Sequence, residues 1–121
     1  MLTIDDAIAT SLELEPVGFM REPWGTALDC PMEMRRCELW RSDDGRITTG
    51  VWECDAGRFQ TYFDGVGEFI RVITGDMTCT ADDGTTVALG PGDSMTFPPG
   101  WSGVWAVHVP MRKIFCGFEA T

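Results

Sequence analysis

The sequence predicts an all-β domain built as a small sandwich or barrel. Short runs rich in Val, Ile, Thr, Phe and Trp alternate with turn signals about every ten residues, and the chain of 121 residues contains 14 glycines. The segments S-D-D-G-R at 42–46 and A-D-D-G-T at 81–85 each place Asp-Gly between stretches of strand-like composition. Both are expected to form hairpin turns, because Gly45 and Gly84 supply the positive φ that tight hairpins require.

Residues 1–32 are predicted to be an N-terminal arm that leads into an irregular connection. Residues 3–12 suit one short helix, with Thr3 as the N-cap and two aspartates near its positive end, or alternatively a frayed arm. Residues 16–31 hold three prolines and two glycines, so we expect an irregular connection lying over the barrel.

Residues 33–121 are predicted to form the barrel domain. A chain of 13.4 kDa is expected to fold as one domain with one core, burying about two-thirds of its surface. The expected strands are 33–40, 47–54, 58–63, 68–74, 77–81, 86–89, 94–97, 103–109 and 112–118.

Composition excludes several classes of partner. Nine Lys and Arg against 19 Asp and Glu give a net charge of −10, and no basic cluster is longer than a pair, so we expect neither nucleic-acid binding nor docking to an anionic membrane. No apolar run approaches the 18 or so residues of a membrane span, and the N-terminus lacks a basic leader region. We therefore expect a cytoplasmic protein.

Cysteine and histidine usage limits the metal chemistry. The five cysteines contain no C-x-x-C pair and are expected to be buried, reduced thiols. His108 is the single histidine, so one chain cannot assemble a three-His zinc site or a two-His-one-carboxylate iron site. The sequence therefore predicts no metal centre of these types.

Strong alternation marks the segment 58–64. Phe59, Thr61 and Phe63 share one face of a strand, whereas Arg58, Gln60, Tyr62 and Asp64 share the other. Such a polar stripe is typical of a solvated outer face, and it could also line a polar interior.

Two spaced motifs resemble those of the cupins, a family of small β-barrels. Glu68 and Gly75 match the E-(x)6-G half of the first motif, and Gly92, Pro98 and Gly100 match G-(x)5-P-x-G of the second. The likeness spans roughly residues 47–118 and implies a double-stranded β-helix, also called a jelly-roll barrel. Five short segments most resemble the single-domain cupins grouped with ureidoglycine aminohydrolase. They are G-V-W-E (50–53), G-E-F (67–69), P-G-D (91–93), P-P-G-W-S-G-V-W (98–105) and M-R-K (111–113).

The metal-ligand positions of that family are changed in this chain. Tyr62 and Asp64 occupy the histidine positions of the first motif, Gly103 occupies that of the second, and Glu68 alone keeps the family residue. His108 is offset by one residue from the end of the second motif, so it is expected to face outward. No transition metal is predicted, although a hard cation held by Asp64, Glu68 and Tyr62 is chemically allowed.

The resemblance implies that Tyr62, Asp64, Glu68 and Gln60 enter the barrel, and that Gly103 leaves room where an imidazole would stand. Two neighbouring carboxylates in a cavity would favour one holding its proton, which allows acid–base catalysis by Glu68 and Asp64 with Tyr62 orienting a carbonyl. The alternative is a buried hydrogen-bonded network that only fixes the core.

Further ligand-binding residues are expected around this interior. Trp52, Trp101 or Trp105 could form an apolar wall, although most aromatic side chains are expected to be core. Arg112 and Lys113 alternate on the last strand, so one of them faces inward and could neutralise Glu68 or hold a substrate carboxylate.

Three functions remain open at the level of the sequence. The chain could be a metal-independent enzyme acting on a small polar metabolite, a non-catalytic protein that binds such a ligand as a sensor or accessory subunit, or a structural module. A homodimer is the expected assembly, because the family resemblance implies it.

Overall fold

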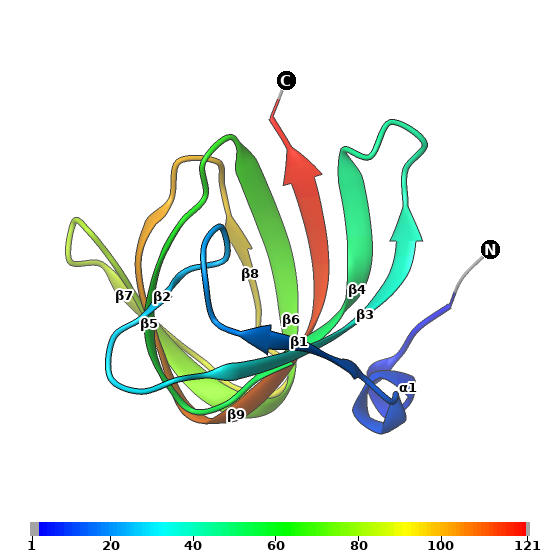
Figure 1. The fold of residues 1–121 in the computed structure, drawn as a ribbon, viewed down its shortest axis with the longest axis horizontal. Coiled ribbons are helices and arrows are strands. Elements are labelled where there is room, and N and C mark those ends of the chain that lie inside the picture. The colour runs from blue at the N-terminus through cyan, green and yellow to red at the C-terminus, as the bar shows by residue number, and fades with distance from the viewer. Residues whose placement is uncertain (1–2, 121) are drawn as a thin grey trace.

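The computed structural model describes residues 3–120, which form an open, strongly curled β-barrel with one short helix outside it (Figure 1). The all-β jelly-roll prediction is confirmed. The elements are α1 (Asp6–Ser11), β1 (Glu15–Phe19), β2 (Thr26–Ala27), β3 (Glu33–Arg41), β4 (Ile47–Cys54), β5 (Gly57–Tyr62), β6 (Val66–Ala81), β7 (Thr86–Leu89), β8 (Ser94–Phe97) and β9 (Ser102–Glu119). Within residues 3–120, no helix is long and apolar enough to cross a membrane.

All strand pairs are antiparallel. The strands follow the order β1-β3-β4-β9-β5-β2, and β6 pairs with β7, β8 and β9. The two longest strands, β6 and β9, therefore curl through the whole barrel and connect its two halves. The predicted hairpin turns are confirmed, because Gly45 and Gly84 have φ of 72° and 90° between paired strands.

Each of these long strands was predicted as two shorter ones, which is wrong. Pairing between β6 and β9 continues past Gly75 and Pro110, with register shifts between Val72 and Met77. Gly75 adopts a φ of 79°, and a Cβ there would lie 2.3 Å from the carbonyl oxygen of Pro110. The glycine thus bends the strand without ending it, and the bend curls the sheet into a barrel.

The predicted irregular connection over residues 16–31 is also partly wrong. β1 pairs with β3 and β2 pairs with β5, so this segment extends the sheet at both edges. The helix forms, but it starts at Asp6 rather than after Thr3. Its N-cap is Asp5, whose side chain accepts a hydrogen bond from the backbone N of Ile8 at 2.8 Å.

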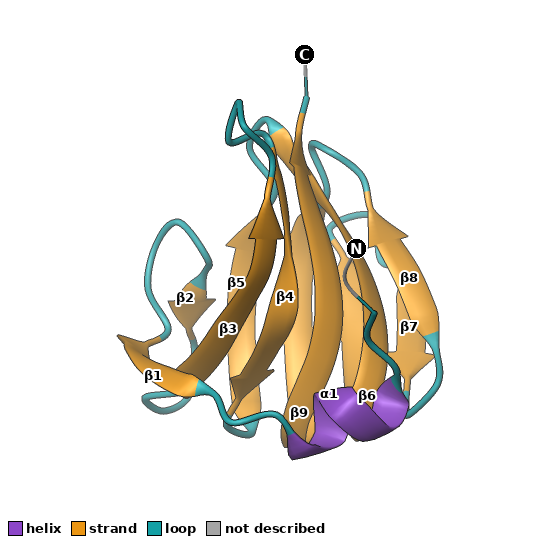
Figure 2. Ribbon diagram, turned by 90° about the vertical axis from the view of Figure 1, so that its right-hand side faces the viewer, coloured by secondary structure: helices purple, strands orange, loops and turns teal. Residues whose placement is uncertain are grey.

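Two apolar clusters lie on opposite sides of the sheet. The larger fills the barrel interior and includes Met34, Trp52, Phe97 and Trp105. In the smaller, Ala9 of α1 packs on the outer face of the sheet. Figure 2 shows α1 lying across the lower ends of β6 and β9. The helix therefore covers part of the outer face of the sheet and does not enter the barrel.

Candidate functional site

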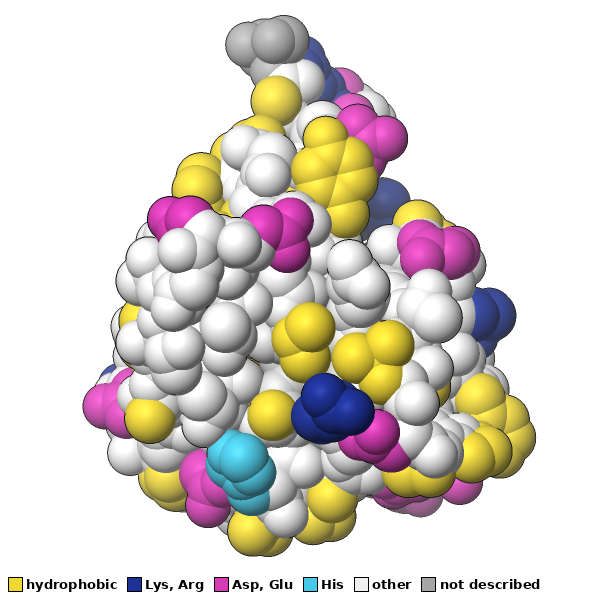
Figure 3. Space-filling view, turned by 90° about the vertical axis from the view of Figure 1, so that its left-hand side faces the viewer, with side chains coloured by type: hydrophobic (Ala, Val, Ile, Leu, Met, Phe, Trp, Pro, Cys, Tyr) yellow, Lys and Arg dark blue, Asp and Glu magenta, His cyan; other side chains and the backbone are white. Residues whose placement is uncertain are grey.

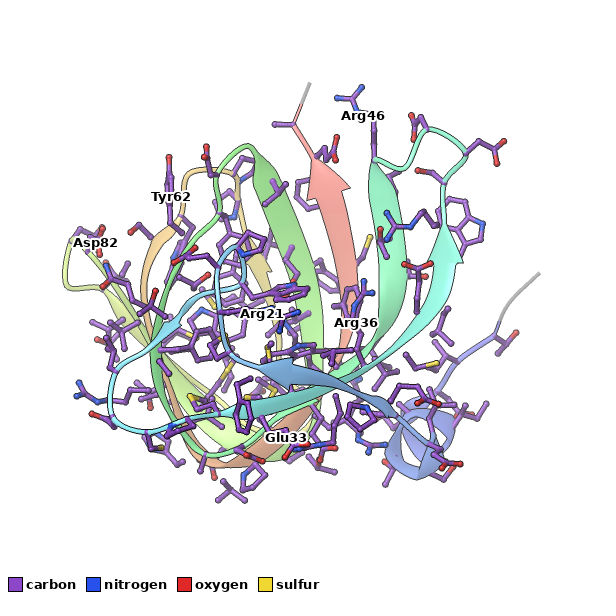
Figure 4. All side chains as sticks on the ribbon, viewed as in Figure 1. Arg21, Glu33, Arg36, Arg46, Tyr62 and Asp82 are labelled. Carbon is purple, nitrogen blue, oxygen red and sulfur yellow. The ribbon has the colours of Figure 1, made fainter. Side chains whose placement is uncertain are left out.

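One end of the barrel holds a cavity of about 460 Å³. In Figure 4, Tyr62 and Arg46 lie on opposite sides of this end, and Arg36 lies lower, beneath Arg46. Its aromatic lining consists of Trp24, Trp52, Phe59, Tyr62, Phe63, Trp105, Phe115 and Phe118. Its charged lining consists of Arg36, Arg41, Arg46, Lys113, Glu22, Asp64, Glu68 and Glu119.

A buried ion pair lies in this cavity. Lys113 Nζ on β9 donates a hydrogen bond to Glu68 Oε1 on β6, and the two side chains are 6% and 19% exposed. Because side chains alternate along β9, Lys113 shares the inner face with Met111 and Phe115, whereas Arg112 lies on the outer face. Lys113 is thus the inward basic residue of that pair, and it neutralises Glu68.

Aromatic rings surround the ammonium group. Lys113 Nζ lies 4.6 Å from the ring centroid of Trp52, 4.7 Å from that of Trp105 and 6.0 Å from that of Phe115. The electron-rich ring faces replace part of the hydration that the cation loses on burial. These three rings and Glu68 together hold the Lys113 ammonium in one position.

The thiols of the core do not contribute nucleophiles. Burial raises the pKa of Cys54 and of Cys79 to about 12, and the nearby positive charge of Lys113 only partly opposes this rise. Both thiols are therefore protonated at neutral pH, and a protonated thiol is a poor nucleophile.

The predicted catalytic residues reach the cavity at different depths. Glu68 lies with its ion-pair partner among the aromatic rings, whereas Asp64 is exposed and Tyr62 is 56% exposed. Figure 4 shows the Tyr62 side chain pointing away from the barrel body at the rim. The structure therefore brings the three residues to one cavity without clustering them.

The facing predicted for the segment 58–64 is wrong. Phe59 and Thr61 are 3% and 6% exposed and point inward, whereas Gln60 is exposed and does not line the cavity. Burying aromatic area against Trp105, at 5.3 Å between ring centroids, outweighs placing the polar stripe inside. The one inward hydroxyl is satisfied, because Thr61 donates to the carbonyl of Trp24 at 2.8 Å.

The room expected at Gly103 is also absent. A Cβ there would lie 2.3 Å from the carbonyl oxygen of Thr80 and 2.7 Å from the ring of Trp101. Trp101 stacks edge-on against Phe97, with ring centroids 5.0 Å apart, and does not line the cavity. Close strand pairing and this indole ring fill the place of the family's imidazole.

The side chains at the family's ligand positions do not fit a histidine-type metal centre. Tyr62 points outward, Gly103 has no donor, and Glu68 is already held by Lys113. Within residues 3–120, no three His, Cys, Asp or Glu side chains gather as ligands. His108 is exposed as predicted, with Nε2 2.8 Å from Thr78 Oγ1, and Figure 3 shows the histidine on the outer surface.

Arg112, the other basic candidate, lies on the outer face of the sheet and does not line the cavity. Its guanidinium donates to the backbone carbonyls of Ala9, Thr10 and Leu12 at 2.8 to 3.0 Å and to Glu53 Oε2 at 3.1 Å. These contacts bind α1 to the outer face of the sheet, so Arg112 has a structural role.

Arg36 and Phe115 are among the lining residues that were not predicted from the sequence. Arg36 lies on the inner face of β3, two residues after the buried Met34, and its Cζ is 5.1 Å from the ring centroid of Phe115. The sequence held a signal for both residues, because side chains two positions apart on a strand share a face. Arg36 stands two residues after the apolar Met34, and Phe115 stands two residues after Lys113.

Comparison with known families supplies a name for this barrel. The model of the EutQ-like cupin domain matches residues 41–115. The chain belongs to the EutQ-like cupin family. A comparison of this cupin with curated proteins found no match.

Solved structures resemble this cupin in fold. EutQ from Clostridium difficile is 21% identical with a TM-score of 0.63, over 74% of this chain and 64% of that one. An ethanolamine utilization protein Q candidate from Salmonella typhimurium is 18% identical with a TM-score of 0.64, over 90% and 96%. A protein of unknown function from Pseudomonas syringae pv. tomato is 16% identical with a TM-score of 0.75, over 88% and 45%. The match thus spans under two-thirds of the first and third relatives.

Proposed function

We propose that this cupin binds a small organic molecule in the open end of its barrel. The volume of about 460 Å³ falls within the range usual for ligand sites, and aromatic walls with a few converging polar groups are the usual lining. The buried Lys113–Glu68 pair at this cavity carries the proposal.

A buried ion pair is a poor device for stability alone. Two well-packed apolar side chains of similar volume would often stabilise the fold equally well or better, because removing both charges from water is costly. Placing the pair in this cavity is consistent with its use for recognition. A ligand could accept from the ammonium of Lys113 or donate to the carboxylate of Glu68.

Filling the cavity tests this function. Gly117 lines the cavity, and a Cβ there would meet only the carbonyl oxygen of Thr48, at 3.9 Å. Gly117→Leu should therefore fold and block binding. Gly90→Leu is the matched control, because the space around Gly90 is open and Gly90 is not among the lining residues.

The measurement is thermal stabilisation by a panel of small carboxylates, amides and amino acids, since binding to the native state must raise the Tm. The natural chain and Gly90→Leu should be stabilised by the same compounds, and Gly117→Leu by none of them. If no compound stabilises any of the three proteins, the proposed function is wrong. Equal stabilisation of Gly117→Leu would place binding elsewhere.

A metal-independent acid–base enzyme of hydrolase, lyase or isomerase type is the second candidate. Glu68 Oε1 holds Lys113, and among the described residues Glu68 Oε2 has no hydrogen-bond partner, so it could accept a proton from a bound molecule. Asp64 and Tyr62 at the rim would orient that molecule. The motifs of the chain resemble those of the cupins grouped with ureidoglycine aminohydrolase, whose amine hydrolysis relies on a bound metal, so we do not expect that reaction here.

Glu68→Gln separates the enzyme from the binding protein. If Glu68 carries the proton, the variant should lose turnover while keeping its affinity within a few-fold. Equal loss of affinity and turnover would assign Glu68 to recognition. Asp43→Asn is the matched control, because Asp43 is exposed and does not line the cavity, and it should leave turnover unchanged.

A further inference from the structure

One wall of the cavity carries a positive charge that lacks a carboxylate of its own. The Arg36 side chain is only 25% exposed, and among residues 3–120 its guanidinium makes no hydrogen bond. Its ion-pair partner is Glu38, at 3.7 Å from Nη1 to Oε1. That same oxygen already accepts from Nε and Nη2 of Arg41, at 3.2 and 2.7 Å. Two guanidinium groups thus share one carboxylate.

The other cations of the cavity are better compensated. Lys113 is bound to Glu68, and Arg46 lies 3.9 Å from Glu119 and donates to the carbonyl of Ala120 at 3.1 Å. Asp64 and Glu22 add negative charge at the exposed rim. The least compensated cation of the cavity is therefore Arg36, which shares Glu38 with Arg41, in a chain of net charge −10.

An aromatic ring lies directly beside this cation. Arg36 Cζ is 5.1 Å from the ring centroid of Phe115, and Lys113 Nζ is 6.0 Å from the same centroid. Gly50 allows the ring to approach β4, because a Cβ at that position would lie 2.9 Å from two ring atoms. The cavity thus combines a half-buried guanidinium with an apolar surface next to it.

We propose that the ligand is a monocarboxylate with a flat apolar body, whose carboxylate binds Arg36 while the body lies against Phe115. This inference rests on the proposed function and names its ligand class. A guanidinium presents a planar set of donors that matches a carboxylate in two parallel hydrogen bonds. A single negative charge fits better than two, because Glu68, Asp64 and Glu22 line the same cavity.

Calorimetric titration with 4-methylbenzoate and 4-methylbenzamide tests the ligand class, since the two differ mainly in charge. The carboxylate should bind about tenfold more tightly or better, and its Kd should weaken with added salt. Equal Kd values for the two compounds would overturn the inference while leaving the proposed function standing. If neither compound binds and the broader panel also fails, the proposed function falls as well.

Variants of Arg36 and of Glu38, the carboxylate that it shares with Arg41, test the role of Arg36. Arg36→Gln should weaken 4-methylbenzoate about tenfold or more and leave 4-methylbenzamide within twofold. Glu38→Gln should tighten 4-methylbenzoate severalfold, because it removes the group that competes for Arg36. Arg58→Gln is the matched control, because Arg58 pairs with Asp29 on the surface and does not line the cavity.

The gain expected for Glu38→Gln keeps the test decisive even if Arg36→Gln does not fold. A purely structural Arg36 would lose stability in both variants and would give no gain in affinity. Unchanged affinity in Glu38→Gln would therefore contradict the inference, as would equal weakening of the two compounds by Arg36→Gln.

Discussion

Lys113 and Glu68 form an electrostatic pair in surroundings that are otherwise aromatic. Each charge is neutralised mainly by the other, since the rings of Trp52 and Trp105 supply only a weaker attraction to the ammonium. The cost of removing one partner is therefore larger than the net contribution of the pair. This asymmetry can be measured.

Lys113→Met should destabilise the protein by about 3 kcal/mol, because Glu68 is left in the cavity without its counter-charge. The double variant Lys113→Met with Glu68→Met should lose only about 1 kcal/mol or less, because neither charge remains. Urea denaturation gives both free energies of unfolding. A double variant as unstable as the single one would show that packing, and not charge, makes Lys113 important.

At the scale of elements, β9 connects the two sides of the sheet. Its inner face presents Lys113 and Phe115 to the cavity, whereas its outer face presents Arg112 to the carbonyl end of α1. A helix of six residues has little stability by itself. Three carbonyl contacts from Arg112, and the ion pair of Asp6 with Arg71 at 2.8 Å, hold it in place.

Arg112→Met should release α1 while leaving the cavity intact. The variant removes donors from three backbone carbonyls and from Glu53, so we expect a loss of about 1–3 kcal/mol and faster proteolysis of the segment before β1. Limited proteolysis followed by mass spectrometry measures the release. Ligand affinity should stay within twofold, and a large loss of affinity would mean that the helix shapes the site.

At the scale of the whole molecule, surface ion pairs set the response to acid. Hydrogen bonds from Arg71 to Asp6 and from Arg58 to Asp29 hold the pKa of each carboxyl below its ordinary value of 3.8. The hydrogen bond from Arg41 likewise lowers the pKa of Glu38 below 4.5. A lowered folded-state pKa contributes stability above the unfolded-state pKa, and that contribution disappears as the pH falls through the folded-state value.

The Tm should therefore fall as the pH drops below about 4.5, where these carboxylates begin to take up protons in the unfolded chain. Between pH 7 and the isoelectric point near 4.3, the net charge of −10 declines, and weaker self-repulsion acts in the opposite direction. Calorimetry from pH 8 to pH 3 should show the highest Tm in the lower part of the range between pH 7 and the isoelectric point. A Tm that rises steadily down to pH 3 would contradict this account.

A homodimer stays a prediction for the assembly. A second subunit would have large exposed apolar side chains to cover, because Trp40, Ile47 and Phe69 are 47%, 40% and 48% exposed. Sedimentation equilibrium at several protein concentrations should give twice the chain mass. A single species of 13.4 kDa at all concentrations would show the chain to be a monomer.

Local patterns in the sequence were enough for the barrel and for part of the site. Hairpin glycines at 45 and 84 and strand alternation predicted an all-β domain, because turn geometry and alternation depend on neighbouring residues. The spaced motifs around Glu68 and Gly92 predicted the jelly-roll barrel through their resemblance to the cupins. Alternation also placed one of Arg112 and Lys113 inside.

Only the tertiary structure decided which face of each strand lies inside. Phe59 faces the core because Trp105 on another strand offers it an apolar contact, and the sequence of one strand carries no record of that partner. Long-range packing likewise filled the space beside Gly103 with the ring of Trp101. It also placed Arg36 beside Phe115, with a carboxylate that it shares with Arg41. Which side chains point into the barrel, and which charges they meet there, depends on residues distant in the chain. Only the folded sheet brings those residues together.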